Sequence, residues 1–438
     1  MTLKKLQNKK IALLGLGTEN YWLLKYLLKN KTKAEITICS SGQIRSDERY
    51  QELKKVKSLK WLNYANRAGS LNNFEILFRS PGWPIFCPAI SSALKINKKI
   101  ILSSPMSLFL DLCPSKNIIG VTGSKGKGTT ASLIYTILKT AGKKVFLGGN
   151  IGVAPFNFIN QITASSWVVL ELSSFQLEDL KQRIKIGVLT NLFKEHLSPA
   201  DPSNPNYHKS YQAYKQAKLN LIAWQKKDDY FILNNTFKGT RLASIGQGKK
   251  IFFSKANLPT SLPGKHNLEN IAAAETVAKI LGLEEKIIAK AVKNFKGLEH
   301  RIEFVRELNG VKYYDDSFAT TPESSIIALK SFQEPIVLLA GGADKGANFK
   351  NLARRIKTDC SFVCLLQGQA TPRIKQELIK VNFKNYKIFN DFKTAIKTAK
   401  QQAKSGEVIL LSTGCASFGM FTNYKERGRL FKEMVNKL

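Results

Sequence analysis

Short apolar runs alternate with stretches of helical spacing along the whole chain. The runs Ile11–Leu14, Ile36–Ser40 and Ile336–Ala340 are predicted strands because they are short and apolar and are bounded by polar or glycine-containing segments. Regular alternation of strands and helices is typical of α/β domains with mostly parallel sheets. The length of 438 residues is enough for two to four such domains, each with its own core.

The first predicted strand ends in a glycine turn, Gly15–Thr18, that is similar to the phosphate-binding turn of dinucleotide folds. The third glycine of that pattern is missing, because Asn20 stands in its place. Neither Cys39 nor Ser40, at the end of the next strand, is the acidic residue that usually holds a ribose. We therefore expect a first domain, residues 1–103, that binds part of a nucleotide-like ligand.

The strongest chemical signal is the segment Gly120–Thr130, which lies between a predicted strand and a predicted helix. Its glycines let backbone N–H groups approach phosphate oxygens closely, and the positive end of the following helix adds to the attraction. Gly128 occupies the place of the usual Mg²⁺-binding Ser or Thr, so Thr129 is the expected hydroxyl. The alternative is an ordinary glycine-rich turn, which the flanking strand and helix disfavour. The predicted nucleotide-binding residues are Thr122, Gly123, Ser124, Lys125, Gly126, Lys127, Gly128 and Thr129.

Two polar residues follow predicted strands of the same region. Glu171 ends the strand that begins at Trp167, and His196 comes shortly after the strand Ile186–Thr190. A carboxylate at such a strand end can hold Mg²⁺ directly or through water. Alone, Glu171 could equally be a strand-end cap and His196 a core histidine. Together with the glycine-rich loop they favour a Mg²⁺-nucleotide site.

The chain after Gly297 predicts a third domain. Asn309–Gly310 is a predicted hairpin turn, because apolar residues flank it. Two further predicted strands end in the loops Gly341–Lys345 and Ser412–Ser417. Open α/β sheets bind ligands at such loops, so we expect a second ligand here.

The net charge of +36 favours anionic partners, and nucleic acid is one candidate. The lysines are spread along the chain, however, and no base-stacking or groove-reading motif is present, so we expect no specific nucleic acid. No apolar run is long enough to cross a bilayer and no signal peptide is evident, which predicts a cytoplasmic protein without membrane insertion. Six cysteines do not make a disulfide framework in a chain of this length, and Cys360 and Cys364 are predicted buried thiols.

Several motifs occur in a fixed order and cover nearly the whole chain: Gly120–Thr130, Glu171–Glu178, His266–Asn270, Gly297–Arg301, Asp316–Ser317, Lys345 and Cys415–Ser417. In this order they resemble the Mur ligases of peptidoglycan precursor synthesis. The resemblance implies a Rossmann-like UDP-sugar-binding domain over residues 1–103, a central P-loop ATPase domain with a mostly parallel sheet over 104–296, and a Rossmann-like amino-acid-binding domain over 297–438. We expect a monomer.

The resemblance also implies a reaction, the ATP-dependent addition of glutamate, D-glutamate first of all, to UDP-N-acetylmuramoyl-L-alanine through an acyl phosphate. The implied catalytic residues are Lys127, Glu171, His196 and Lys218. One Mg²⁺ would lie at Thr129 and Glu171, and a second at His196 and Lys218, with the lysine modified to a carbamate. The spacing from His196 to Lys218 is longer than we expect for the family, and Asp201–Asn206 is interpreted as an insertion. The alternative for Lys218 is a solvated helix lysine.

The remaining implied contacts fall into three groups. Those to ATP are Asn267, Asn270, Arg301 and Asp316. Those to the UDP-sugar are Gly17, Thr18, Ser80 and Gly82. Those to the incoming amino acid and the adjoining loop are Lys345, Ser417, Phe421, Ser317 and Thr320.

Three positions depart from the family pattern. The sequence pattern around Gly128 resembles that of the folylpolyglutamate synthases. Phe318 stands where the family pattern has a lysine, and Phe418–Met420 stands where it has Leu-Asp-Gln. The last two fall in the loops expected to shape the amino-acid pocket, so L-glutamate is an alternative to D-glutamate. A folylpolyglutamate synthase-like ligase and a nucleotide-dependent nucleic-acid-binding protein are the remaining alternatives.

Overall fold

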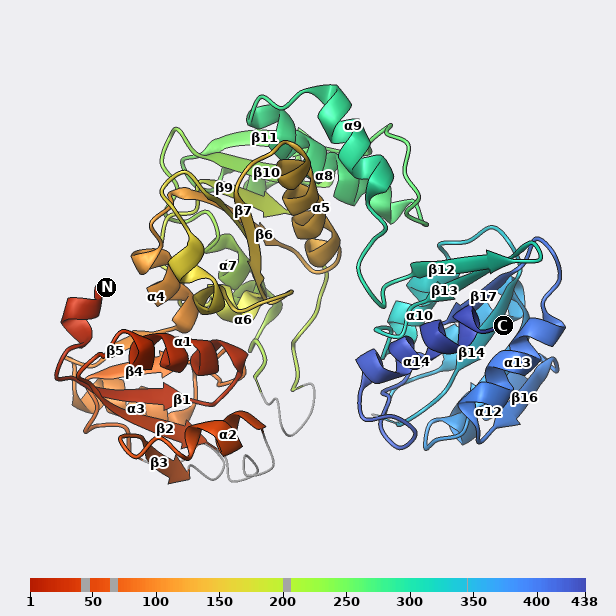
Figure 1. Ribbon diagram of the computed structural model, residues 1–438, viewed down its shortest axis with the longest axis horizontal. Helices are drawn as coiled ribbons and strands as arrows, with labels where there is room; N and C mark the ends of the chain where they lie inside the picture. Colours follow the sequence, from red (N-terminus) through yellow and green to blue (C-terminus); the bar gives the residue numbers. More distant parts are fainter. Residues whose placement is uncertain (41–47, 64–69, 200–205, 345) are drawn as a thin grey trace. The chain divides into compact units, whose positions relative to one another are not determined.

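The computed structural model describes residues 1–40, 48–63, 70–199, 206–344 and 346–438. They form two compact units, which are described separately (Figure 1). The first unit comprises Met1–Leu258 and Leu268–Val292, and the second comprises Pro259–Asn267 and Lys293–Leu438. The first unit contains two sheets and the second contains one.

The first sheet is five-stranded and parallel, with the order β3-β2-β1-β4-β5. Strand order reverses at β1, so the carboxyl ends of β1 and β4 open a crevice that suits a ligand. Its strands are β1 Lys10–Leu14, β2 Glu35–Ser40, β3 Lys60–Asn63, β4 Ile76–Arg79 and β5 Ile101–Ser103. The helices of this region are η1 Leu3–Leu6, α1 Thr18–Lys29, α2 Glu48–Leu53, α3 Pro88–Ile96 and α4 Pro105–Leu112.

Asn20 explains how α1 follows β1 without the third glycine of the dinucleotide pattern. Its side chain is fully buried, and Nδ2 donates to the carbonyls of Gly15 at 2.8 Å, Phe78 at 3.2 Å and Leu14 at 3.3 Å. These carbonyls belong to the ends of β1 and β4 and to the turn between β1 and α1. The amide therefore ties the helix to both strands that border the crevice.

The second sheet has six parallel strands in the order β11-β10-β9-β6-β8-β7. They are β6 Asn117–Thr122, β7 Val145–Gly149, β8 Trp167–Glu171, β9 Ile186–Leu189, β10 Tyr230–Asn234 and β11 Lys249–Phe253. The helical segments are α5 Lys127–Thr140, η4 Pro155–Asn157, η5 Ile159–Gln161, α6 Ser174–Leu177, α7 Tyr211–Leu219, η6 Asn235–Phe237, η7 Arg241–Ser244, α8 His266–Ile280 and α9 Glu285–Asn294. Short α6 is fixed by a capping box between Ser173 and Gln176.

The second unit has a six-stranded sheet in the order β12-β13-β17-β14-β15-β16, in which only the β12–β13 pair is antiparallel. The strands are β12 Glu303–Leu308, β13 Val311–Asp315, β14 Ile336–Ala340, β15 Cys360–Leu366, β16 Tyr386–Phe389 and β17 Val408–Leu411. The helices are α10 Pro322–Leu329, α11 Lys350–Asp359, α12 Thr371–Lys380, α13 Phe392–Gln402 and α14 Tyr424–Asn436. The predicted turn at Asn309–Gly310 is confirmed, since both residues have the positive φ that a tight hairpin needs.

The predicted α/β class with mostly parallel sheets is confirmed. Cys360 and Cys364 are buried free thiols, as predicted, and so are the other four cysteines. Across the part of the chain that the structure describes, every helix is too short or too polar to cross a membrane.

We expect the Asn20→Ala variant to be less stable by about 1–3 kcal/mol, because the carbonyls of Gly15, Phe78 and Leu14 each lose the hydrogen bond from the Asn20 amide. Asn30→Ala is the matched control, since the exposed Asn30 amide donates only to Tyr26 O on the same helix. Urea denaturation monitored by circular dichroism measures both. Equal losses in the two variants would contradict a special role for Asn20.

Candidate functional site

The glycine-rich loop between β6 and α5 has the backbone shape of a phosphate cradle. Gly123 and Gly126 have φ values of 148° and 80°, which favour glycine. A Cβ atom at Gly123 would overlap Thr190 Oγ1, and one at Gly126 would overlap Asn270 Oδ1. Both positions therefore require glycine for space as well as for conformation. Helix α5 begins at Lys127, so its free N–H groups lie at the loop.

Thr190 and Asn191, the two residues that follow β9, hold the loop in place through hydrogen bonds. Thr190 Oγ1 donates to Lys125 O at 2.6 Å, and Asn191 Nδ2 donates to the same carbonyl at 3.1 Å. Asn191 Oδ1 accepts from Lys125 N at 2.8 Å, while its own carbonyl accepts from Ser124 N at 2.9 Å. Sequence reasoning did not find this clamp. The available signal was that both residues follow a strand adjacent to the loop strand.

Several predicted loop residues direct their side chains into the protein. Thr122 Oγ1 donates to Leu172 O at 2.8 Å, and the buried Ser124 hydroxyl lies 2.7 Å from Tyr214 Oη. Lys127 Nζ donates to the carbonyl of Ser124 at 2.8 Å. These side chains shape the loop, and its backbone N–H groups and the Lys127 ammonium group are the groups that could bind an anion. The predicted ligand contacts of Thr122 and Ser124 remain predictions.

Lys218 lies beneath the loop on α7 and is not a solvated lysine. Its side chain is buried, and Nζ donates to Gly123 O at 2.7 Å and sits 4.8 Å from the centre of the Tyr214 ring. Burial, and next the positive charge of Lys127, lower the pKa of Lys218 to about 6. The amine is therefore neutral at pH 7, and a neutral amine is the form that reacts with carbon dioxide to give a carbamate.

Glu171 ends β8 directly beside β6, where it pairs with Val121. Its carboxylate is buried and accepts from Asn150 Nδ2 at 3.0 Å. Asn150 N also donates to the Glu171 carbonyl at 2.9 Å. Asn150 was missed by sequence reasoning, although it follows a glycine pair at the end of the neighbouring strand β7. The two hydrogen bonds between Asn150 and Glu171 hold the Glu171 carboxylate in one orientation beside the loop.

The His196 side chain is exposed, and its backbone has a positive φ of 57°. Desolvation by the surrounding protein lowers the pKa of His196; the positive charges of Lys127, Lys218 and Lys125 add to this, and Glu195 opposes it. A second histidine, His208, supports it by donating its backbone N–H to His196 O at 2.8 Å. Residues 201–205 of the predicted insertion lie outside the described residues.

The His208 ring is fixed on all sides. It stacks on Phe175 with centroids 4.8 Å apart, and Nε2 lies 2.9 Å from Ser174 Oγ. Burial, and next the proximity of His196, lower the pKa of His208 to about 4, so it is neutral at pH 7. His208 was also missed, because its partners are distant in sequence.

The residues around the loop fit Mg²⁺. Glu171 and Thr129 offer the hard oxygen donors that Mg²⁺ prefers, and His196 offers a neutral imidazole. The charges of Lys127 and Glu171 both act on the pKa of Lys218, which places the three groups close together. An ammonium group at Lys218 would oppose a cation, whereas a carbamate would supply two oxygen donors.

The predicted UDP-sugar residues gather at the crevice of the first sheet. A Cβ atom at Gly17 would lie 3.8 Å from Ser80 Cβ, so the turn after β1 touches the loop after β4. Ser80 N donates to Leu14 O at 3.1 Å, and Gly82 lies in the turn closed by Trp83 N and Ser80 O. The exposed Thr18 Oγ1 accepts from Arg49 at 3.3 Å.

In the second unit, Arg301 and Asp316 lie on adjacent segments. The Arg301 guanidinium is 3.8 Å from the centre of the Phe318 ring, a cation–π contact. Asp316 accepts from Ser412 Oγ at 2.7 Å and from Ile302 N at 3.2 Å, and burial raises the pKa of its carboxyl to about 7.

Ser317 has its polar groups occupied inside the second unit. Its hydroxyl donates to Tyr424 O at 2.8 Å and accepts from Arg427 Nε at 2.9 Å. Its own N–H donates to Asp315 Oδ1 at 2.9 Å. Thr320 is partly exposed nearby. The predicted substrate contact of Ser317 stays a prediction, and the structure gives this serine an internal bonding role.

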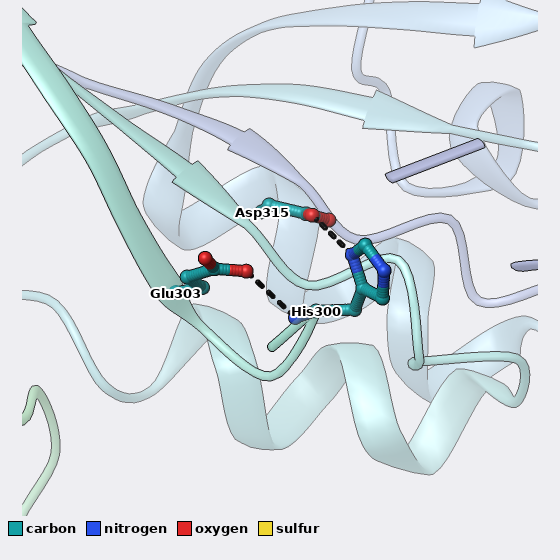
Figure 2. Close-up of side chains that lie close together, drawn as sticks. All are labelled: His300, Glu303 and Asp315. Atoms are coloured by element: carbon teal, nitrogen blue, oxygen red, sulfur yellow. Dashed lines mark hydrogen bonds and ion pairs between the residues drawn. The ribbon is translucent and has the colours of Figure 1, made fainter. Parts of the chain in front are cut away.

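His300, Glu303 and Asp315 form a tight cluster (Figure 2). Arg301 follows His300 directly in the chain. His300 Nδ1 lies 2.6 Å from Asp315 Oδ2, and His300 N donates to Glu303 Oε2 at 2.8 Å. The Lys432 ammonium group is 3.1 Å from Glu303, which disfavours a cation there. The cluster instead fixes the backbone from which Arg301 projects.

The predicted glutamate-binding loops are joined by backbone pairing, since Ala343 N donates to Ala416 O at 3.0 Å. Ser417 is buried and its carbonyl accepts from Phe421 N at 3.1 Å, while the Phe421 ring packs on Phe392 with centroids 4.9 Å apart. Lys345 lies outside the described residues.

The two predicted ATP asparagines of α8 belong to different units. Asn270, in the first unit, accepts from Thr130 Oγ1 at 3.3 Å and so lies beside the phosphate loop. Asn267, in the second unit, donates to Pro263 O at 2.7 Å.

Comparison with known proteins agrees with this arrangement. The Mur ligase middle domain matches residues 121–257, and the Mur ligase glutamate ligase domain matches residues 300–415. A UDP-N-acetylmuramoylalanine--D-glutamate ligase of Acetivibrio thermocellus is 35% identical over 474 aligned residues, covering 99% of this chain and 98% of the relative. The chain belongs to the Mur ligase family.

Solved Mur ligase structures share the fold. The UDP-N-acetylmuramate-alanine ligase MurC of Thermotoga maritima has a TM-score of 0.58 at 15% identity, covering 98% of this chain and all (100%) of its own. The MurF ligase of Thermotoga maritima in complex with ADP has a TM-score of 0.57 at 17% identity, covering 100% and 97%.

We expect a stability difference between the wild type and Lys218→Met that grows in favour of the wild type as the pH rises from about 6 to about 9. Over this range the unfolded chain carries a proton on Lys218 that the folded chain, with its pKa of about 6, does not carry. The free energy of unfolding of the wild type therefore rises with pH relative to the variant. Melting temperatures in buffers free of carbon dioxide measure this pH-dependent stability difference. Lys215→Met is the control, because Lys215 lies on the same helix and is partly exposed. A difference that is flat with pH would show that the Lys218 amine is charged.

Proposed function

We propose that this Mur ligase joins the amine of D-glutamate to the carboxylate of UDP-N-acetylmuramoyl-L-alanine, at the expense of ATP. The observation that carries the proposal is the phosphate loop with Glu171, His196 and Lys218 around it, in a chain whose full-length relative bears the name of that ligase. The reaction belongs to peptidoglycan precursor synthesis and takes place in the cytoplasm. We propose that the enzyme acts as a monomer.

The chemistry begins with a phosphoryl transfer. A carboxylate oxygen of the acceptor attacks the γ-phosphorus of ATP, the bond to the β,γ-bridging oxygen breaks, and ADP leaves. The resulting acyl phosphate is an activated electrophile. Lys127 and the N–H groups of the loop stabilise the charge that spreads over the transferring group.

The second step forms the amide. The neutral amine of glutamate attacks the acyl carbon, and the tetrahedral intermediate loses inorganic phosphate and a proton. Asn267, Asn270, Arg301 and Asp316 are proposed to contact ATP. Ser317, Thr320, Lys345, Ser417 and Phe421 are proposed to shape the glutamate site.

Mg²⁺ bound at this site supplies charge neutralisation of the phosphates. Thr129 and Glu171 are the residues that would hold one ion, and His196 with a carbamylated Lys218 a second. Asn150 orients the Glu171 carboxylate, and His208 holds the His196 backbone. These second contacts restrict each donor to one position.

The amino-acid loops give a reason to test L-glutamate as well. The exposed Phe318 contacts Arg301 where the family pattern has a lysine, and the exposed Phe418 follows Cys415–Ser417. Both replace side chains of different charge or shape. D-glutamate is the amino acid named for the relative and is our primary assignment.

We expect the purified protein with Mg²⁺-ATP and UDP-N-acetylmuramoyl-L-alanine to release phosphate when D-glutamate is added. L-glutamate is the parallel arm, and omission of the acceptor is the control. Phosphate release coupled to formation of the amide product, identified by mass spectrometry, supports the assignment. Release with L-glutamate alone would overturn the D-glutamate assignment, and no release in either arm would overturn the substrate assignment.

We expect Lys127→Met to lower kcat by about 10²-fold or more, because one donor to the transferring phosphoryl group is lost. Lys139→Met is the matched control, since Lys139 is an exposed residue of the last turn of the same helix. Steady-state kinetics of phosphate release measure both. A Lys127→Met variant with kcat near that of the control would remove Lys127 from the mechanism.

A further inference from the structure

Arg79 is a buried arginine in the first unit. It is the last residue of β4, and only 1% of its surface is exposed. Its guanidinium donates from Nε to Asp179 Oδ2 at 2.9 Å and from Nη2 to Phe175 O at 2.8 Å. Nη1 donates to Trp83 O at 2.9 Å and lies 3.4 Å from Glu178 Oε2. Every nitrogen of the guanidinium therefore has a partner.

Most of these partners do not belong to the sheet that carries Arg79. Phe175, Glu178 and Asp179 lie in and just after α6, in the region of the second sheet. A buried charge is costly unless it is paired and hydrogen-bonded, and breaking such a pair is strongly destabilising. The guanidinium is therefore a rigid connection between the two sheets of the first unit rather than a surface ion pair.

The two ends of this connection lie next to the two segments proposed to hold the two ends of the acceptor. Arg79 immediately precedes Ser80–Gly82, the loop proposed to anchor the UDP-sugar. Phe175 lies four positions after Glu171, the proposed Mg²⁺ ligand, and its ring stacks on His208. One side chain thus reaches from the nucleotide-sugar loop to the segment that carries the phosphoryl-transfer carboxylate.

Neighbouring contacts join the same two regions. Gln176 Nε2 donates to Glu19 in the first turn of α1. Asn206 Nδ2 donates to Pro81 O at 2.6 Å, and Tyr207 packs edge-on against Phe86 at 5.1 Å. The segment just before His208 therefore also rests on the loop that follows Arg79.

We propose that Arg79 is a positioning residue that sets the distance between the loop anchoring the nucleotide sugar and the centre where the acyl phosphate forms. This inference rests on the proposed function. The acceptor is held at its uridine end and reacts at its other end, so the carboxylate reaches the γ-phosphate only when the two sheets are correctly spaced. A displacement of about 1 Å is enough to lower a rate by about 10²-fold.

The test compares Arg79→Met with Arg183→Met. Arg183 pairs with Asp229 at 2.7 Å; the Asp229 side chain is fully buried, the Arg183 side chain is exposed, and both residues lie in the region of the second sheet. Arg79→Lys is the third variant, because it keeps the charge while losing the forked set of bonds. Melting temperature, kcat, KM for ATP and binding of ADP are measured for each with the full-length chain.

We expect Arg79→Met to lower kcat by about 30-fold or more while ADP affinity stays within about threefold of wild type. The kcat of Arg79→Lys should lie between those of the wild type and Arg79→Met. Arg183→Met should keep kcat within about threefold of the wild type, even if its melting temperature falls as much as that of Arg79→Met. A kcat for Arg79→Met equal to that of Arg183→Met would overturn the inference. If Arg79→Met does not fold, Arg79→Lys decides, and wild-type kcat in that variant would overturn it.

Failure of the proposed function is recognised separately, because the wild type itself would then release no phosphate with either glutamate. In that case amide hydrogen exchange of residues 172–180 decides. Faster exchange in Arg79→Lys than in Arg183→Met supports the connection between the sheets, and equal exchange overturns it.

Discussion

The backbone of the phosphate loop must present its N–H groups to a ligand, and the rest of the second sheet is arranged to make that possible. The carbonyls on the other side of the loop have to be bonded inside the protein. Lys218 Nζ donates to the carbonyl of Gly123, and Lys127 Nζ donates to that of Ser124. Thr190 and Asn191, which follow β9, both donate to the carbonyl of Lys125. The loop conformation, the burial of Lys218 and the position of Asn191 are therefore parts of one constraint.

The same constraint gathers basic groups at the site. Burial, and next the positive charge of Lys127, lower the pKa of Lys218 to about 6, so its amine is neutral at pH 7. We expect an anionic ligand at the loop to neutralise the Lys127 ammonium group. The net charge of +36 draws anions of every kind to the surface. Selection of the ligand falls to the loop geometry, not to the charge.

Local sequence patterns were enough for the fold class, the hairpin at Asn309–Gly310 and the phosphate loop, because their structural causes lie within a few residues. The long-range hydrogen bonds that hold the site together could not be predicted from the sequence. Asn191, Asn150, His208 and Arg79 act on partners up to about a hundred residues away, and their local sequence does not show which groups they bond. Asn20 shows the opposite error, since an apparent defect in a glycine pattern is a buried amide that bonds the ends of two strands.

Transfer of oxygen from the acceptor to phosphate tests most directly whether this chain forms an acyl phosphate. UDP-N-acetylmuramoyl-L-alanine labelled with ¹⁸O in its carboxylate is turned over with Mg²⁺-ATP and D-glutamate, and the released phosphate is examined by mass spectrometry. We predict one ¹⁸O atom in each phosphate, because the carboxylate oxygen that attacks the γ-phosphorus leaves with it. Unlabelled phosphate alongside normal product would contradict the acyl-phosphate mechanism.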